Sequence, residues 1–403
     1  MNILQVVPYF YPAMAYGGTP RIVYEFSKTL VASGHQVTVY TTNVLDKESV
    51  LKVSDNPTYV DGIKTYYFRN ISNSIAWNQK LCISPGLVAQ ARREVKTFDV
   101  INMFEPRSVQ NIIVHHYAKK YGVPYTISAG GSVLRIGRQG RKWIFDVLYG
   151  YRILRDAAYA IAGTTIEVDE YKKMTVNENR IALLTPPVDV ENFSKPPPPG
   201  RFREKFGIKE KHIVLFLGRI NNIKGLDFLV KSFHELAKVR DDVILALVGP
   251  DDGYKGTLEI LIRELNLANR VLFTGFLSGD DKLSAYVDAT MFVQPSSFES
   301  SPGSPFEAIL CNTPIIITKD TGAGEIVAGI DAGYLVQYGN IDELAGRMRQ
   351  ILDDPTEALD KTRKAKQYIL GNLSWKTRIK DYEKLYESMS PKGDPNEAGY
   401  STF

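Results

Sequence analysis

Short apolar runs alternate with amphipathic segments along almost the whole chain, and this alternation limits the possible folds more than any other feature of the sequence. It begins with a strand-like run at residues 3–7, a glycine-containing loop, a periodic segment at 21–32 and a second strand at 36–42. Thr19, directly before Pro20, is expected to cap the first helix. Because repeated strand-helix-strand segments form parallel units with right-handed crossovers, the pattern predicts doubly wound α/β domains. Further strands are expected at 63–68, 100–103, 125–128, 158–162 and 181–184, with helices near 85–96, 107–121 and 141–156.

Prolines interrupt the alternation once, at Pro186, Pro187 and the run from Pro196 to Pro199 that precedes Gly200. Proline lacks a backbone N–H and cannot continue a central strand, so this stretch is expected to link two domains. The alternation then restarts, with strands at 212–217, 243–248, 271–274, 291–294 and 314–318, and it ends in helices beyond residue 341.

A length of 403 residues is too great for one compact core and suits two domains of ordinary size. We therefore expect two Rossmann-like doubly wound α/β domains that face each other across a cleft. The expected bounds are 1–190 and 212–373 for the domains, 191–211 for the link, 374–390 for a final helix and 391–403 for a flexible tail.

Composition narrows the class of protein. Cys82 and Cys311 are far apart and lack metal-ligand spacing, which favours a reducing compartment over a disulfide framework. No apolar run approaches the roughly 18 residues of a membrane span, and residues 1–10 lack a basic leader, so a cytoplasmic protein is expected. Residues 1–195 carry 23 Lys and Arg against 16 Asp and Glu. That mild basic excess favours an anionic ligand or surface near the first half and does not indicate a nucleic-acid partner.

The segment 292–310 combines a buried strand, a loop rich in Gly, Ser and Pro, and a helix predicted after Pro305. It carries Glu299 on the loop and Glu307, which is expected in the first helical turn, where negative charge is favoured. Loops at the carboxyl ends of parallel strands bind the ligands of open sheets. This segment is therefore the predicted active-site loop.

A second loop, from Gly218 to Gly225, follows another apolar strand and opens a helix. Arg219 offers a planar fork to phosphate oxygens, Lys224 offers a flexible point charge, and the glycines allow close approach of the backbone. A diphosphate site is one interpretation, and a turn with two solvated cations is the other. The loop matches neither a Walker motif nor a dinucleotide-binding fingerprint.

With Gly218-Arg219, Lys224-Gly225 and then Glu299 and Glu307 in this order, the chain resembles the retaining glycosyltransferases of the GT-B fold, of family 4 or group 1. The resemblance extends to the Gly17-Gly18 loop, the proline link and the helix at Ser374-Trp375, which in that fold returns to the first domain. It covers nearly the whole chain.

The resemblance implies a metal-independent hexosyltransferase that moves a sugar from a nucleotide-diphosphate donor to a hydroxyl acceptor, glycan or lipid-linked. The nucleotide-sugar would be a substrate, and no cofactor is implied. Arg219 and Lys224 would bind the diphosphate, Glu299 would face the donor sugar, and Glu307 would bind the ribose. The implied catalytic residues are Arg219, Lys224 and Glu299, and the implied donor-binding residues are Gly17, Gly18, Gly218, Phe276, Leu277, Gly303, Ser304 and Glu307.

Two departures from the resembled pattern bear on the ligands. Many relatives place a His in the loop that here reads Ala129-Gly130-Gly131. Relatives often carry a glycine three residues after the first Glu, where this chain has Pro302, which has no N–H to offer an oxygen. The identity of the donor is therefore not implied.

Several alternatives stay open. The segment 134–156 mixes Arg and Lys with Trp143 and other apolar residues, and is either a peripheral contact with an anionic membrane or a core-packed helix with a solvated basic face. Gly322 to Glu325 could border the site, although a turn is favoured. The function could also be that of a sugar-nucleotide epimerase of the same fold, or of a non-catalytic sugar-nucleotide-binding relative.

Overall fold

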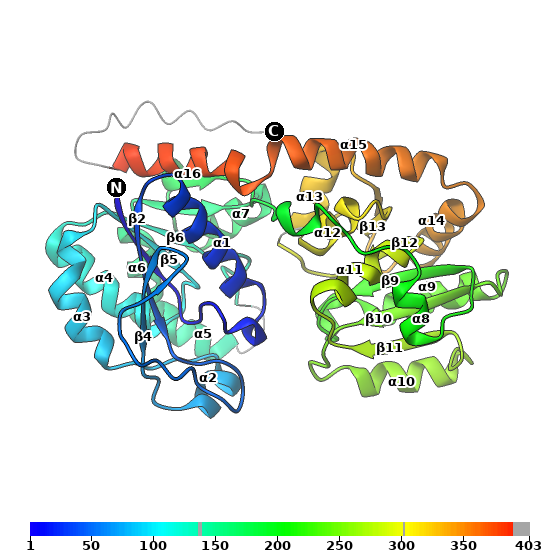
Figure 1. The fold of residues 1–403 in the computed structure, drawn as a ribbon, viewed down its shortest axis with the longest axis horizontal. Helices are drawn as coiled ribbons and strands as arrows, with labels where there is room; N and C mark the ends of the chain where they lie inside the picture. The colour runs from blue at the N-terminus through cyan, green and yellow to red at the C-terminus, as the bar shows by residue number, and fades with distance from the viewer. Residues whose placement is uncertain (136–138, 301–302, 390–403) are drawn as a thin grey trace. The chain divides into compact units, whose positions relative to one another are not determined.

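The computed structural model describes residues 1–135, 139–300 and 303–389 (Figure 1). The chain divides into two compact units. The first comprises Met1–Pro186 together with the segment from Trp375 onward, and the second comprises Pro187–Ser374. Each unit has its own parallel sheet and its own apolar core, which confirms the prediction of two Rossmann-like α/β domains.

The sheet of the first unit has eight strands in the order β3-β4-β2-β1-β5-β6-β7-β8. Every pair is parallel except β3 with β4. The chain starts in the middle of the sheet, builds outward through β2 on one side, and later returns to build outward from β5 on the other. The strands are β1 (Asn2–Val6), β2 (Gln36–Thr42), β3 (Thr58–Val60), β4 (Ile63–Phe68), β5 (Val100–Phe104), β6 (Tyr125–Ser128), β7 (Tyr159–Ala162) and β8 (Ile181–Leu183).

Helices cover both faces of this sheet, because successive residues of a strand point to opposite sides. On β1, Leu4 packs into a core with residues of α3 and α4, whereas Ile3 packs into a core with residues of α1 and α16. The helices are α1 (Gly18–Ala32), α2 (Asn73–Gln79), α3 (Gly86–Glu94), α4 (Val109–Tyr121), α5 (Gln139–Phe145), a π-helix (Asp146–Gly150), α6 (Tyr151–Asp156), α7 (Thr165–Lys173) and α16 (Trp375–Met389).

The final helix, α16, lies beside α1 although the whole second unit separates them in sequence (Figure 1). The ring of Phe26 on α1 lies 5.7 Å from that of Trp375 and 4.7 Å from that of Tyr382. At the base of α16 the two connections between the units run together, because Val188 N donates to Leu373 O at 2.7 Å.

The sheet of the second unit has six strands, all parallel, in the order β11-β10-β9-β12-β13-β14. Alternate residues of β9 again enter two cores, Ile213 and Leu215 on one face and Val214 and Phe216 on the other. The elements are α8 (Arg201–Phe206), β9 (His212–Leu217), α9 (Leu226–Ala237), β10 (Val243–Val248), α10 (Lys255–Glu264), β11 (Val271–Gly275), α11 (Gly279–Asp288), β12 (Met291–Gln294), α12 (Gly303–Leu310), β13 (Ile315–Thr318), α13 (Gly322–Gly329), β14 (Tyr334–Val336), α14 (Ile341–Asp353) and α15 (Thr356–Asn372).

The segment 191–211, expected as a link, contains helix α8 and packs within the second unit. Asp288, at the end of α11, accepts hydrogen bonds from Gly200 N, Phe202 N and Arg203 N at 2.5, 2.8 and 3.1 Å. These are N–H groups of the first turn of α8, which have no partner inside their own helix. The carboxylate of Asp288 on α11 therefore fixes the 191–211 segment to the second unit, although the prolines of this segment suggest a simple link between domains.

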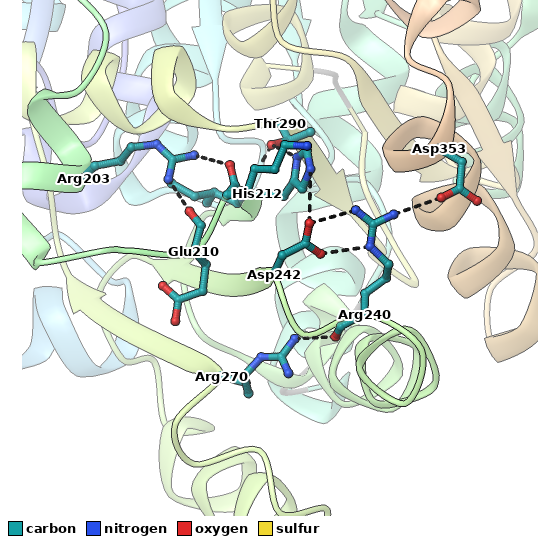
Figure 2. Close-up of polar contacts among 10 residues, drawn as sticks. Arg203, Glu210, His212, Arg240, Asp242, Arg270, Thr290 and Asp353 are labelled. Atoms are coloured by element: carbon teal, nitrogen blue, oxygen red, sulfur yellow. Dashed lines mark hydrogen bonds and ion pairs between the residues drawn. The ribbon is translucent and has the colours of Figure 1, made fainter.

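Ion pairs close the amino-terminal edge of the second sheet, the edge opposite the predicted site (Figure 2). Arg240 forks onto Asp242 with two hydrogen bonds of 2.9 Å and reaches Asp353, before α15, at 3.0 Å. The guanidinium of Arg240 lowers the pKa of the Asp242 carboxyl to about 2. His212 faces Thr290 at 3.3 Å, and burial lowers the pKa of its imidazole. The charged side chains at this edge therefore bind one another within the protein, whereas the carboxyl edge carries the loops that could bind a ligand.

Candidate active site

Strands β9 and β12 form the point at which the second sheet changes direction. From β9 the chain builds outward through β10 and β11, and from β12 it builds the other way through β13 and β14. The loops after β9 and β12 therefore leave the sheet in opposite directions, and ligands of open α/β sheets bind at such a point. These two loops are the ones that the sequence singled out, 218–225 and 295–300.

Glycines allow the loops to approach more closely than other residues would. Gly225 has φ +63°, and a Cβ atom added to it would lie 2.1 Å from Pro295 O. Ser297 donates to Ile223 O twice, through its backbone N at 2.9 Å and its hydroxyl at 3.1 Å. On the other side of β9, a Cβ atom at Gly249 would lie 1.8 Å from Gly218 O. The backbone therefore fixes the 218–225 loop between its two neighbours.

This approach brings together Lys224 and Glu299, two of the three predicted catalytic residues. The Lys224 ammonium forms an ion pair with Glu299 Oε2, and Gln294 Nε2 donates to the same oxygen at 2.5 Å. The two charged side chains are only 16% and 18% exposed. Charges act more strongly on a ligand where little water screens them, so this pair can bind and orient a polar substrate.

Arg219, the third predicted catalytic residue, lies at the other end of the same loop and contacts neither member of that pair in the interactions described. Its Nη1 donates to Asp252 Oδ2 at 2.9 Å, and Asn221 Nδ2 donates to the same oxygen at 3.1 Å. More than half of the Arg219 side chain is exposed. The two cations of the loop thus have separate carboxylate partners, and Arg219 has the greater freedom to turn toward a ligand.

Glu307 lies in the second turn of its helix, so the prediction of a first-turn position was wrong. α12 begins at Gly303, and Pro305 falls inside its first turn, where a missing N–H costs no helical hydrogen bond. The charge of Glu307 is balanced by side chains of α11: Lys282 Nζ lies 2.5 Å from Oε2, and the Tyr286 hydroxyl donates to it at 2.9 Å. The sequence offered no signal for these partners, which come from another helix.

Other predicted donor-binding residues occupy the same edge. Phe276, in the loop after β11, is 69% exposed, while its neighbour Leu277 packs against the apolar core. Gly303 and Ser304 open α12. Pro302, at which the chain departs from the resembled pattern, lies outside the described residues.

Gly322 to Glu325 form the first helical turn of α13. The sequence favours a non-helical turn between elements at this position, and that prediction was wrong. Thr321 caps this helix by accepting from Gly324 N at 3.0 Å. A Cβ atom at Gly322 would lie 2.6 Å from Ser300 O, and Ala323 N donates to Glu299 O at 3.3 Å. The start of α13 therefore supports the backbone of the loop that carries Glu299.

In the first unit, Gly17 and Gly18 lie where β1 leads into α1. Gly17, with φ +106°, is the N-cap residue, and α1 begins at Gly18. The N-cap prediction for Thr19 was wrong, because this residue lies inside the helix. Its hydroxyl instead donates to Glu105 Oε1, from the loop after β5, at 2.9 Å. Glu105 was not identified from the sequence, although an acidic residue directly after a buried strand could have drawn attention to it.

The Ala129-Gly130-Gly131 loop after β6 is held by buried side chains of α7. Gly131 N donates to Glu167 Oε1 at 3.0 Å, and Ala129 N donates to the Tyr171 hydroxyl at 3.0 Å. Burial raises the pKa of the Glu167 carboxyl. Arg107 adds hydrogen bonds of 2.5 and 2.7 Å to the carbonyls of Ser132 and Val133. Where many relatives are expected to have a His, this chain has a fixed backbone.

The described ranges contain neither a metal-ligand cluster nor a membrane-crossing helix. Within them, no group of three or more His, Cys, Asp and Glu side chains could hold a metal ion. None of the helices in the same ranges combines the length and the apolar character that crossing a membrane requires. Cys82 and Cys311 are free and buried, one in each unit.

Two sequence profiles match the chain, one over most of the first unit and one over most of the second. The profile described as Glycosyltransferase Family 4 matches residues 16–192. The profile described as Glycosyl transferases group 1 matches residues 200–368, which include both loops of the candidate site.

Relatives among the curated proteins match over shorter stretches. The chain is 29% identical over 171 residues to the 2-deoxystreptamine glucosyltransferase of Streptomyces kanamyceticus, covering 42% of this chain and 44% of that protein. It is 28% identical over 203 residues to the GDP-mannose-dependent alpha-(1-6)-phosphatidylinositol monomannoside mannosyltransferase of Mycolicibacterium smegmatis, covering 48% and 53%. The chain thus matches about half the length of these relatives.

Solved structures share the fold over nearly the full length. Sucrose-phosphate synthase from Thermosynechococcus elongatus superposes with a TM-score of 0.75 at 18% identity, covering 96% of this chain and 99% of that one. HepE of Anabaena in complex with UDP-glucose gives 0.74 at 18% identity, covering 96% and 100%. The two profiles and the shared two-domain fold show that the chain belongs to the group 1 and family 4 glycosyltransferases of the GT-B fold.

Proposed function

We propose that the protein is a retaining hexosyltransferase that moves a sugar from a nucleotide-diphosphate donor to a hydroxyl group of a glycan or lipid-linked acceptor. The observation that carries this proposal is the little-exposed Lys224–Glu299 ion pair at the switch point of the second sheet, on the same loop as Arg219. A cation on each end of this loop suits the two phosphates of a nucleotide-sugar.

The proposed step breaks the bond between the anomeric carbon and the diphosphate and forms a bond from that carbon to the acceptor oxygen. The acceptor hydroxyl proton passes to a leaving phosphate oxygen on the same face of the sugar, so configuration is retained without a protein nucleophile. Negative charge grows on the diphosphate as it leaves, and Arg219 and Lys224 would stabilise it. The two cations make a metal ion unnecessary in this proposal.

The remaining donor contacts follow from the side chains around the pair. Glu299, already oriented by Lys224 and Gln294, would accept hydrogen bonds from sugar hydroxyls. Glu307 would accept from the ribose, with Lys282 and Tyr286 holding its carboxylate in place. The exposed ring of Phe276 suits a stacking contact with the base.

A donor screen tests this function. UDP-glucose and GDP-mannose are suitable first donors, because a solved neighbour was obtained with the former and a relative is named for its dependence on the latter. We expect the protein to release UDP or GDP slowly from one of these donors, at the same rate in the presence of EDTA. The Glu299→Ala variant should lose this release of nucleotide. Calorimetry should show that the variant still binds the nucleotide. Glu259→Ala, on the exposed surface of α10, is the matched control. Binding without turnover would instead indicate a non-catalytic relative, and epimerised donor would indicate an epimerase.

We further propose that the segment from α5 to α6 contacts an anionic membrane surface. Five apolar side chains there are 42 to 53% exposed: Trp143, Ile144, Val147, Leu148 and Tyr149. Spacings of four residues place Trp143 beside Val147 and Ile144 beside Leu148 on the helical surface. Exposed Arg141, Arg152 and Arg155 lie in the same segment, and an apolar face with basic neighbours suits a bilayer with anionic lipids.

Liposome sedimentation tests the membrane contact. We expect the protein to sediment with phosphatidylcholine vesicles that contain phosphatidylglycerol, less so at high salt, and not with phosphatidylcholine alone. Leu148→Glu should weaken this binding severalfold, because a charge would replace an inserting apolar group. Ile260→Glu is the matched control, since Ile260 is as exposed as Leu148 but lies on α10 of the second unit. No sedimentation at low salt, or equal loss in both variants, would refute the contact.

A further inference from the structure

The sheet of the first unit also has a switch point, the place between two strands at which the strand order changes direction. The carboxylate of Glu105 lies there. The sheet changes direction between β1 and β5, so the loops after these strands diverge there. Glu105 is the first residue after β5, and Thr19, which follows the loop after β1, donates to its carboxylate. None of the roles proposed above uses Glu105.

The backbone of Glu105 is held in a conformation that non-glycine residues seldom adopt. Its φ is +56°, in the left-handed region. The buried side chain of Asn111 holds it there by donating to the carbonyls of Phe104 and Glu105, each at 3.0 Å, while Glu105 N donates to Ser128 O at 3.3 Å. Such strain persists only where surrounding contacts impose it, and it is common at functional sites.

Side chains from α1, from the loop after β6 and from α5 surround this carboxylate. Besides Thr19, the hydroxyl of Ser132 after β6 and the ammonium of Lys142 on α5 act on Glu105, and both favour its charged form. Burial outweighs them and raises the pKa of the carboxyl. A little-screened acceptor that already binds the Thr19 hydroxyl is the kind of group that binds substrate hydroxyls.

Aromatic rings extend from this point. Burial is the main cause that raises the pKa of the Tyr9 hydroxyl, and the charge of the Glu105 carboxylate is the second. The two groups are therefore neighbours. The ring of Tyr9 stacks on that of Tyr16 at 4.4 Å, and Trp77 meets Tyr16 edge-on at 5.3 Å. Tyr16 and Trp77 are partly exposed. Aromatic rings beside a hydroxyl-binding group provide apolar contact for the C–H faces of a sugar ring.

We propose that Glu105 is a specificity-determining residue for the acceptor: its carboxylate accepts a hydrogen bond from a hydroxyl of a carbohydrate acceptor whose ring packs against Tyr16 and Trp77. A phosphate or carboxylate group at this point is disfavoured, because it would lie against another anion. The inference rests on the proposed glycosyl transfer and names the chemical class of the group that receives the sugar.

Simple sugars serve as probes. Methyl α-D-glucopyranoside and methyl α-D-mannopyranoside, at millimolar concentrations, should increase nucleotide release from UDP-glucose or GDP-mannose by the wild-type protein and yield a glycoside product. Glu105→Gln should reduce this sugar-dependent rate about 10- to 100-fold, as expected for a lost hydrogen bond to a charged group. The dissociation constant of UDP or GDP, measured by calorimetry, should stay unchanged, because Arg219, Lys224 and Glu307, whose side chains are proposed to hold the nucleotide, belong to the other unit.

A second variant separates a binding role from a structural one. Glu105→Gly removes the carboxylate and the strain together, so it should lose the sugar-dependent rate while its Tm stays equal or rises. A structural carboxylate would give a lower Tm. Glu178→Gln, at an exposed ion pair of the same unit, should change neither quantity.

Different results would overturn different claims. Turnover of donor without stimulation by either sugar, or stimulation preserved in Glu105→Gln, would overturn the acceptor assignment alone. If the wild-type protein neither binds nor turns over either donor, the proposed transferase function fails, and the acceptor assignment fails with it.

Discussion

Replacing Lys224 by alanine will lower kcat by about two to three orders of magnitude, the scale measured when one preorganised group that stabilises transition-state charge is lost. Its ammonium lies at the switch point of the second sheet, is 16% exposed and is already oriented by Glu299. A preorganised charge in a poorly solvated position stabilises a leaving diphosphate more than an exposed one. The affinity for substrate should therefore fall less than kcat does.

Single-turnover nucleotide release with the donor found in the screen measures this effect. Lys231→Ala, on the exposed side of α9, controls for the loss of a nearby positive charge. The double variant Lys224→Ala/Glu299→Ala separates pairing from catalysis, since it leaves no uncompensated carboxylate. A double variant that regained activity would show that Lys224 only neutralises Glu299, and an unchanged kcat in the single variant would refute the assignment.

Gly225→Ala will disrupt the same site through the backbone. A left-handed conformation costs a non-glycine residue roughly 1–2 kcal/mol. At this position the new Cβ atom would also lie 2.1 Å from Pro295 O, so the loops after β9 and β12 must separate. We expect loss of stability together with loss of nucleotide binding of at least about tenfold, equivalent to about 1.4 kcal/mol, because Lys224 and Glu299 are drawn apart.

Gly207→Ala is the matched control, since Gly207 has φ +65° and nothing lies within 4 Å of its added Cβ. It carries the same backbone strain at the end of α8, away from both loops. Thermal unfolding and calorimetry with UDP or GDP should show a lower Tm in both variants and weaker binding in Gly225→Ala alone. Equal binding in the two variants would mean that the close approach of the loops does not shape the site.

The central strands could be predicted from sequence because burial on both faces requires continuous apolar runs, as in β10, which is buried throughout. Shorter or more polar elements escaped prediction. β3 has three residues and no buried one, and α7 buries Glu167 and Glu170, which read as surface residues. Their stability comes from tertiary contacts that local patterns do not encode.

Part of the candidate site could likewise be predicted from the sequence, and part of it could not. The loops of Lys224 and Glu299 could be found because glycines and charged residues follow apolar strands. The charge partners of Arg219 and Glu307 could not, since Asp252 and Lys282 reach the site from other segments of the chain. Thr19 shows the limit most clearly: its sequence context fits a helix cap, but a carboxylate from another loop binds its hydroxyl.

The return of α16 to the first unit makes the second unit an insertion in the topology of the first. Its two junctions are adjacent, as the hydrogen bond from Val188 N to Leu373 O shows. Residues 187–374 could therefore be exchanged as one piece between related chains through a single pair of neighbouring joints. Residues 1–186 expressed alone would instead lack α16, a helix of their own core. If the donor binds the second unit and the acceptor the first, as proposed above, recombination at this pair of joints would give such a protein a new donor while it keeps its acceptor.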